Sequence, residues 1–408
     1  MLNKIWSYFF AVALAAVAWR LAHGDTDVVG TTMAAVFDSA TLAAKIALGL
    51  IGVLSLWMGL MRLGELSGMI GVLAKLFEPL LAKLMPELPK GDRAFGSVTM
   101  NLTANLLGLD TAATPLGLKA MADLQRHNGQ PDTASNAQIM FLVLNTSSVT
   151  LVPVTIFLYR AQQGAVAPAD VFLPILLATS CSTLVGLLAV AWWQRLPLLN
   201  LTVAAYAAAG VAFLGSLIAY LGTLSADMIG HVSTLAGNIV LLGLIFSFVL
   251  TALVRHVAVY EEFVDGAKEG FEQAIKLIPY LLAMLLAIAL LRGSGALDLL
   301  LDALRWLVAL VGIDNRFVDA LPTALMKPFS GSGARAMMLE TMNHYGVDSF
   351  AGRLASIFQG STETTFYVLA VYFGAVGIKN GRHAVACGLL ADVAGILAAI
   401  VLAYWFYG

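Results

Sequence analysis

Two stretches of the sequence place side-chain oxygens and helix-breaking residues together within apolar surroundings. The first, residues 96–121, reads GSVTMNLTANLLGLDTAATPLGLKAM, and the second, residues 321–342, has KPFSGSGAR at its centre. Because Gly108, Pro115 and Gly117 interrupt a helix in the first stretch, we predict a re-entrant hairpin of two half-helices there, and a second hairpin tip at KPFSGSGAR. Backbone at such a tip is tolerated at membrane depth only where it is buried in protein or lines a water-filled cavity. Half-helix N-termini carry partial positive charge, so the expected chemistry is the binding of an anionic or oxygen-rich ligand.

A hydroxyl-rich cluster follows each stretch, at residues 145–150 (NTSSVT) and 359–365 (QGSTETT). Glu363 of the second cluster lies just inside an apolar run, where a carboxylate is costly unless it is paired or functional. It is therefore a candidate for binding a solute, a proton or a cation. The structural alternative is an ion pair with Lys327 or Arg335 of the neighbouring hairpin.

We expect these segments to meet at one central site. Its predicted solute-binding residues are Asn101, Asn105, Thr114, Asn145, Ser147, Ser332, Gln359, Thr362 and Glu363. Its predicted ion-coupling residues are Glu363 and Asp110, with Na⁺ or H⁺ as the ion. Asp392, which interrupts the last apolar run, is a weaker candidate.

Other kinds of chemistry lack their motifs. Cys181 and Cys387 both lie in apolar runs and are too few for a metal cluster or a disulfide framework. The absence of HExxH, GxSxG and GxxxxGK[ST] patterns argues against an enzyme, and against nucleotide hydrolysis in particular. We therefore expect no catalytic residue, no metal and no resident cofactor. A formal net charge of -2 also argues against a nucleic-acid partner.

The elements that position these residues follow from the composition. Sixty per cent of the 408 residues are hydrophobic and 12% are charged, whereas soluble domains carry about 25% charged residues. A membrane-spanning helix needs about 20 mainly apolar residues. The charge-free candidate runs are 5–19, 46–61, 133–159, 171–194, 196–226, 228–254, 277–291, 364–378 and 393–408. We predict an all-α polytopic membrane protein with re-entrant helical hairpins and interrupted transmembrane helices, embedded in the lipid bilayer.

The chain also matches itself. Residues 113–129 and 330–346 align without a gap, and the shared positions are Met121 and Met338, Asp123 and Glu340, His127 and His344, and Gly129 and Gly346. Segments 70–84 and 297–311 each have an apolar face at helical spacing with charges opposite, which is typical of helices that lie in the membrane interface.

We predict two inverted-topology repeats, at 41–196 and 272–408. An N-terminal span with its outer loop (1–40) precedes them, and two linking spans with a cytoplasmic connector (197–271) separate them. Inverted repeats with interrupted helices are a recurring plan of secondary transporters.

Positive charges predict the orientation. The long hydrophilic connector at 255–276 is placed inside, because cytoplasmic loops carry an excess of Lys and Arg. This assignment puts the N-terminus in the cytoplasm and the C-terminus outside a bacterial inner membrane. It leaves four arginines on the outer side against the rule: Arg160, Arg292, Arg305 and Arg316.

Both polar segments resemble a known family. NLTANLLGLDTAATPLGLKAM, followed by NTSSVTLVPVT, resembles the spore maturation protein A family, and KPFSGSGARAMMLE, followed by IFQGSTETTFYVLAVYFGAVG, resembles spore maturation protein B. The chain looks like a fusion of the two, within the nucleoside recognition (Gate) superfamily. That superfamily includes the membrane part of the ferrous-iron transporter and is similar to the concentrative nucleoside transporters. The resemblance implies two hairpins and two unwound spans, with substrate where they meet, and it places Glu363 like a polar binding residue.

The leading hypothesis is an ion-coupled secondary transporter of a small polar or anionic solute, nucleoside-like at the family level. One alternative is an uncoupled channel or metal permease. Another is a membrane scaffold for envelope or spore-type maturation. A homo-oligomer is left open as a further partner.

Overall fold

A computed structural model describes residues 2–89, 91–107, 110–147, 150–198 and 200–408. Within these ranges every regular element is a helix, apart from one isolated bridge between Thr133 and Asn380. Seven of the described helices are long and apolar enough to cross a membrane. The prediction of an all-α polytopic membrane protein is therefore confirmed.

The helices fall into two series with the same order, joined by a pair of long helices. After α1 (Leu2–Ala22), the first series consists of α2 (Asp27–Leu66), α3 (Met69–Leu84), α4 (Arg93–Leu106), α5 (Asp110–Gln125), α6 (Asn136–Ser147), α7 (Val154–Gln162), the 3₁₀ turn η1 (Pro168–Val171) and α8 (Phe172–Gln194). The joining helices are α9 (Leu201–Leu221) and α10 (Ala226–Val254). The second series consists of α11 (Val259–Gly293), α12 (Ala296–Leu310), η2 (Arg316–Ala320), α13 (Leu321–Met326), α14 (Gly331–Tyr345), α15 (Phe350–Ser361), α16 (Thr365–Ala375) and α17 (Ala384–Tyr407).

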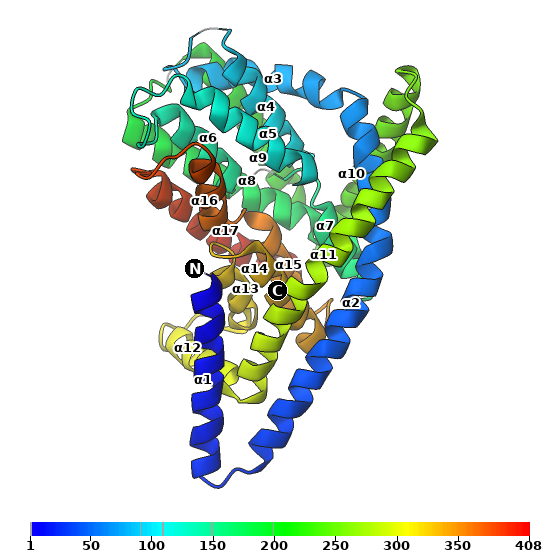
Figure 1. Cartoon of the computed structure of the whole chain (residues 1–408), viewed down its shortest axis with the longest axis vertical. Coiled ribbons are helices and arrows are strands. Elements are labelled where there is room, and N and C mark those ends of the chain that lie inside the picture. Colours follow the sequence, from blue (N-terminus) through cyan, green and yellow to red (C-terminus); the bar gives the residue numbers. More distant parts are fainter. Residues whose placement is uncertain (1, 90, 108–109, 148–149, 199) are drawn as a thin grey trace.

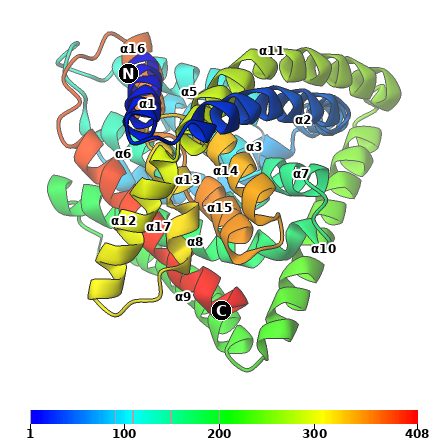
Figure 2. The same ribbon diagram turned by 90° about the horizontal axis from the view of Figure 1, so that it is seen from below.

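Equivalent elements of the two series point in opposite directions. In Figure 1, α2 rises along one side of the molecule to α3 at the top, whereas α11 descends beside it to α12 in the lower half. Figure 2, the view from below, shows the same two long helices side by side. The antiparallel arrangement of these equivalents is what an inverted repeat requires.

The same Ser-Gly turn ends the first helix of each series. The hydroxyl of Ser67 donates to the carbonyl of Gly64, and that of Ser294 donates to the carbonyl of Leu291. The next residue, Gly68 or Gly295, adopts a left-handed φ of 70° or 78°, which an L side chain rarely adopts. Each turn starts one of the two amphipathic helices predicted from the sequence, α3 and α12.

Small residues allow the α2 and α11 backbones to touch. A Cβ added to Gly270 would lie 2.5 Å from the carbonyl oxygen of Leu54, and one added to Gly266 would lie 2.6 Å from that of Met58. Such close approach is a common device of helix packing in membranes. With 40 residues in α2 and 35 in α11, both helices exceed the length that a hydrocarbon core of about 30 Å requires. The pair forms a long support beside the hairpins.

Several predicted boundaries need correction. The run at 133–159 is two helices, α6 and α7, because Pro153 and the hydroxyl cluster interrupt it in the middle. The run at 364–378 is the second half of another interrupted helix, α15–α16. Most of the predicted connector at 255–276 is helical and forms the beginning of α11, so the actual loop is only a few residues long.

The base of the first hairpin is held by capping residues. Asp92 caps α4 by accepting a hydrogen bond from the backbone N–H of Ala94 at 2.8 Å, and its other carboxylate oxygen lies 2.8 Å from Nε2 of His127. The Ala94 N–H is the main cause that holds the pKa of Asp92 below its usual value. Asp123 pairs with Arg93 at 3.2 Å across the same base. Asp123 and His127 thus hold the base of the first hairpin through these two contacts.

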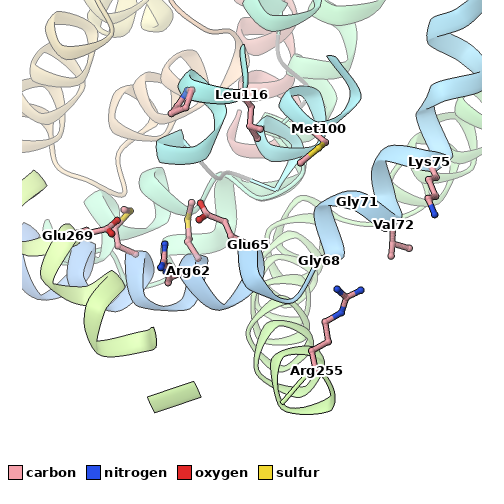
Figure 3. A pocket seen from close by; sticks show the side chains of 13 residues that line it. Arg62, Glu65, Gly68, Gly71, Val72, Lys75, Met100, Leu116, Arg255 and Glu269 are labelled. Atoms are coloured by element: carbon pink, nitrogen blue, oxygen red, sulfur yellow. The ribbon is translucent and has the colours of Figure 1, made fainter. Parts of the chain in front are cut away.

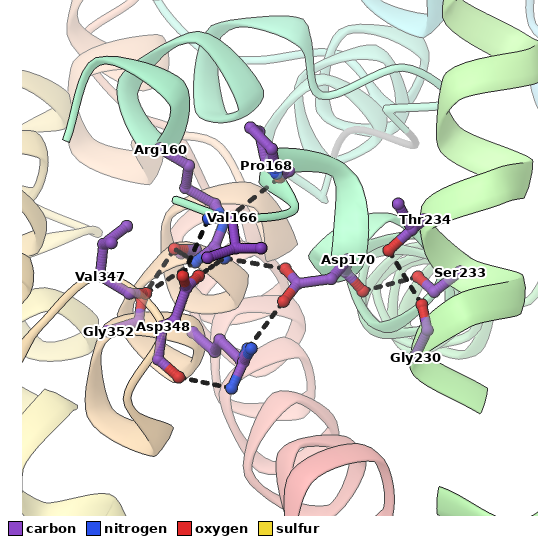
Figure 4. Close-up of polar contacts among 12 residues, drawn as sticks. Arg160, Val166, Pro168, Asp170, Gly230, Ser233, Thr234, Val347, Asp348 and Gly352 are labelled. Carbon is purple, nitrogen blue, oxygen red and sulfur yellow. Dashed lines mark hydrogen bonds and ion pairs between the residues drawn. The ribbon is translucent and has the colours of Figure 1, made fainter. Parts of the chain in front are cut away.

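A buried charge network joins the two series at the ends of α7 and α17 (Figure 4). The guanidinium of Arg160 has no solvent exposure and lies 2.9 Å from a carboxylate oxygen of Asp170 and 2.9 Å from one of Asp348. Arg353 pairs with the same Asp170 at 2.7 Å, and the Tyr407 hydroxyl donates to the Asp170 carbonyl. Asp348 and Arg353 belong to the second series, so this network fixes the start of α15 against the end of α7.

Candidate solute-binding site

The two interrupted helices meet at their breaks. The backbone N–H of Glu363, between α15 and α16, donates to the carbonyl of Thr146 near the end of α6 at 2.7 Å. The next carbonyl, that of Ser147, accepts from the hydroxyls of Thr179 at 3.2 Å and Thr183 at 3.3 Å, both on α8. A helix end leaves carbonyls without intrahelical partners, and in an apolar bundle they must find others. The partners here are the two hydroxyl groups on α8 and the backbone N–H of Glu363 at the second break.

The second hairpin contacts the second break. The N–H of Phe366 donates to the carbonyl of Pro328 at 3.0 Å, and a Cβ added to Gly331 would lie 2.8 Å from the hydroxyl of Thr364. Ser330 caps α14 by accepting from the N–H of Gly333, and its hydroxyl lies 3.2 Å from that of Ser332. The N-terminus of α14 therefore lies beside the break in α15–α16.

The first hairpin contacts the first break and α16. Nδ2 of Asn105 on α4 donates to Oδ1 of Asn145 on α6 at 2.8 Å. On α5, a Cβ added to Gly117 would lie 2.2 Å from the hydroxyl oxygen of Tyr372. Gly117 and Pro115 lie within α5 and do not interrupt it, which corrects the predicted role of both residues. Gly117 serves as a contact surface rather than a bend.

Most of the predicted solute-binding residues lie around this crossing. Asn105 and Asn145 are bonded to each other, Ser147, Thr362 and Glu363 lie at the breaks, and Ser332 lies at the tip of the second hairpin. Asn101 is directed differently, because its Nδ2 donates to the carbonyl of Ala113 and ties α4 to α5. Thr114, which is half-buried, is the residue after Ala113 on α5. The side chain of Asp110, like residues 108–109 and 148–149, lies outside the described part of the chain.

Three buried oxygens at the centre have no hydrogen-bonding partner among the described residues. They are Oγ1 of Thr146, Oε1 of Gln359 and Oδ1 of Asp392. Burying such a group without a partner is costly, so native structures keep few of them. Oxygens of this kind at the meeting point of two helix breaks are available to a bound polar ligand.

Asp392, a weaker candidate from the sequence, is a buried carboxylate at the polar centre. Its side chain is 2% exposed, and Oδ2 accepts from the hydroxyl of Thr365 at 2.6 Å. Lys327 of the second hairpin, itself 4% exposed, and Glu363 both lie close enough to interact electrostatically with this carboxylate. Arg335, a predicted partner of Glu363, instead lies over the ring of Tyr159 at 5.4 Å.

An open cavity of about 730 Å³ lies beside the first hairpin (Figure 3). Its lining comes from α2, α3, α10 and α11 and from Met100, Pro115 and Leu116 of the hairpin. The charged lining residues are Arg62, Glu65, Lys75, Arg255 and Glu269. None of the predicted site residues whose side chains are described lines this cavity, so the structure separates a closely packed polar centre from an open charged vestibule.

These features define a class of membrane protein: an all-α bundle of two inverted copies, each with a hairpin and an interrupted helix that meet at a polar centre. A family model for nucleoside recognition, Gate, matches residues 47–162 and 274–379. The two matches together cover more than half of the chain and fall in the two helix series. The chain belongs to the nucleoside recognition (Gate) family.

Two curated relatives are similar to parts of the chain. Spore maturation protein B of Bacillus subtilis (strain 168) is 47% identical over 165 residues, which are 40% of this chain and 91% of that protein. Spore maturation protein A of the same organism is 37% identical over 182 residues, 45% of this chain and 90% of that protein. The resemblance recognised in the two polar segments is thereby confirmed.

Proposed function

We propose that this membrane protein is a secondary transporter that couples the movement of a small polar or anionic solute, nucleoside-like at the family level, to a gradient of Na⁺ or H⁺. The observation that carries the proposal is the crossing of two helix breaks and two hairpins inside an apolar bundle, where three buried oxygens have no hydrogen-bonding partner in the part of the chain that the structure describes. Side-chain and backbone groups at such a crossing can replace the hydration of a polar solute.

The proposal assigns roles to the residues at the crossing. Asn145, Gln359 and Glu363 would contact the solute, and closure of the hairpins over the breaks would exclude water from it. No covalent step and no resident cofactor is invoked. The protein would lie in a bacterial inner membrane, with the N-terminus in the cytoplasm and the C-terminus outside, as the distribution of positive charge predicts.

Glu363→Gln is expected to reduce solute accumulation at least about tenfold. A hydrogen bond to a charged group contributes about 1.5–3 kcal/mol, and about 1.4 kcal/mol corresponds to a factor of ten. The measurement uses purified protein in liposomes with a panel of radiolabelled nucleosides and dicarboxylates, under an imposed Na⁺ or H⁺ gradient. Glu78→Gln, on the exposed face of α3, is the matched control and should retain wild-type accumulation.

The same assay separates the alternatives. Flux that never exceeds equilibration under either gradient would instead indicate a channel or permease. The absence of flux for every solute, combined with an unchanged cellular phenotype for Glu363→Gln, would refute transport and favour a membrane scaffold.

A further inference from the structure

The last helices of the two copies, α8 and α17, cross at small residues. A Cβ added to Gly186 would lie 3.1 Å from that of Ala391, and one added to Gly395 would lie 3.2 Å from that of Ser182. Ser182 and Gly186 are four residues apart, as are Ala391 and Gly395. The two helices therefore cross antiparallel, with Ser182 opposite Gly395 and Gly186 opposite Ala391, and the hydroxyl of Ser182 donates directly to the carbonyl of Ala391.

The residues that follow these positions are Thr183 and Asp392. Thr183 donates to the Ser147 carbonyl at the first break, whereas Asp392 accepts from the Thr365 hydroxyl at the second. Both copies thus hold a break with a side chain of their last helix, close to this crossing. Only the second copy places a carboxylate there, so the polar centre is symmetric in shape and asymmetric in charge.

The surroundings of Asp392 suit a group that exchanges a proton. On α16 it meets Thr365, on the second hairpin Lys327, and at the break Thr362 and Glu363. Its Oδ1 is buried and has no hydrogen-bonding partner among the described residues. An ionised carboxylate within a membrane requires a compensating charge, and Lys327 is the cation on the neighbouring hairpin.

We propose that Asp392 is the proton-binding group of this protein and Lys327 its counter-ion. A proton transferred from hydronium to Oδ1 converts the carboxylate to a neutral acid and leaves a water molecule behind. Protonation removes the negative charge of Asp392 that faces the ammonium group of Lys327, and this change favours an anionic solute, such as a carboxylate or phosphate, at the second hairpin. This inference rests on the proposed transport function and specifies its coupling ion and the charge of its solute.

The arrangement favours a proton over Na⁺. A metal cation at Oδ1 would need several oxygen ligands around it. A proton needs one free oxygen and removes the negative charge without adding a ligand shell. Glu363, whose backbone is tied to Thr146, keeps its separate role toward the solute.

Infrared difference spectroscopy of the full-length protein in lipid bilayers tests the proposal without any solute. The C=O stretch of a protonated carboxyl is followed between about pH 4 and pH 9, a range that spans the ordinary carboxyl and histidine titrations. We expect a buried-carboxyl band that disappears in Asp392→Asn, which still offers an acceptor to Thr365. The band should persist in Asp227→Asn, an exposed aspartate at the start of α10.

Two further variants keep the test decisive if Asp392→Asn does not assemble. Lys327→Met removes the counter-ion, and Thr365→Val removes the donor to the ionised carboxylate. Each should move the titration midpoint of the band to higher pH by at least about one unit. The proposal is overturned if the band is unchanged in Asp392→Asn, if it is lost in Glu363→Gln instead, or if added Na⁺ displaces the proton at constant pH.

The outcome is separable from that of the transport assay. A band that depends on Asp392 in a protein without solute flux would refute the transporter and leave the proton site standing. Flux without such a band would refute the proton site alone.

Discussion

Replacing Arg160 with methionine is expected to lower the free energy of unfolding by about 3–5 kcal/mol. The guanidinium is fully buried and is shared between Asp170 and Asp348, and it also donates to the carbonyls of Pro168 and Val347. Removing it leaves Asp170 with Arg353 alone, takes the guanidinium away from Asp348, and leaves both backbone carbonyls without this donor inside the bundle. Titration of the detergent-solubilised protein with a denaturing detergent, followed by circular dichroism, measures the change.

Matched variants separate burial from charge. Lys268→Met breaks an exposed pair with Asp265 and should change stability by less than about 1 kcal/mol. Arg160→Lys keeps the charge but cannot span two carboxylates and two carbonyls, so it should fall between the wild type and the methionine variant. A loss below about 1 kcal/mol for Arg160→Met would show that this network does not hold the copies together.

Gly270→Val is expected to destabilise the protein by about 3 kcal/mol and to abolish solute accumulation. The added Cβ would lie 2.5 Å from the Leu54 carbonyl oxygen and 2.7 Å from the Ser55 Cα, both of which are backbone atoms that cannot rotate away. Overpacking of this kind forces two helices apart and costs about 1–3 kcal/mol or more. Because α2 and α11 also line the charged vestibule, their separation would distort the cavity beside the first hairpin.

The control for this prediction is a glycine on the same helix pair. Gly52→Val on α2 meets nothing within 4 Å and has the same change in intrinsic helix propensity. It should leave both stability and accumulation near the wild-type values. Equal effects of the two substitutions would mean that helix propensity, and not the contact between α2 and α11, determines the result.

The sequence predicts the elements of this fold well where the signal is local. Apolar run length identifies the long helices, and the glycines and hydroxyls at KPFSGSGAR identify the tip of the second hairpin. The Ser-Gly pairs at 67–68 and 294–295 were a further signal of the repeat that the alignment of 113–129 with 330–346 did not include. The interruption within 133–159 is marked by Pro153 and by the hydroxyl cluster but by no charge, so a search for charge-free runs extends across it.

The candidate site depends on contacts that local patterns do not contain. Thr183 and Asp392 acquire their roles only when α8 crosses α17, and no spacing within either helix indicates that crossing. Arg160 illustrates the same limit. Its position at the end of an apolar run suggests an exposed flanking charge. Instead its side chain is fully buried and pairs with Asp170 and Asp348, which are distant in sequence from each other.

The repeated element order also governs how the polypeptide is inserted. In the predicted topology each copy crosses the membrane three times, with α2, the α6–α7 pair and α8 or with their equivalents, and α9 and α10 return the chain to the side it left. The sidedness of the second copy therefore follows from the first by connectivity alone. Arginines in the second copy need not serve as insertion signals, and Arg292, Arg305 and Arg316 are each engaged by a carboxylate: Glu340, Asp319 and Asp314. Two separately synthesised halves would each have to encode their own sidedness, a requirement that a single continuous chain removes.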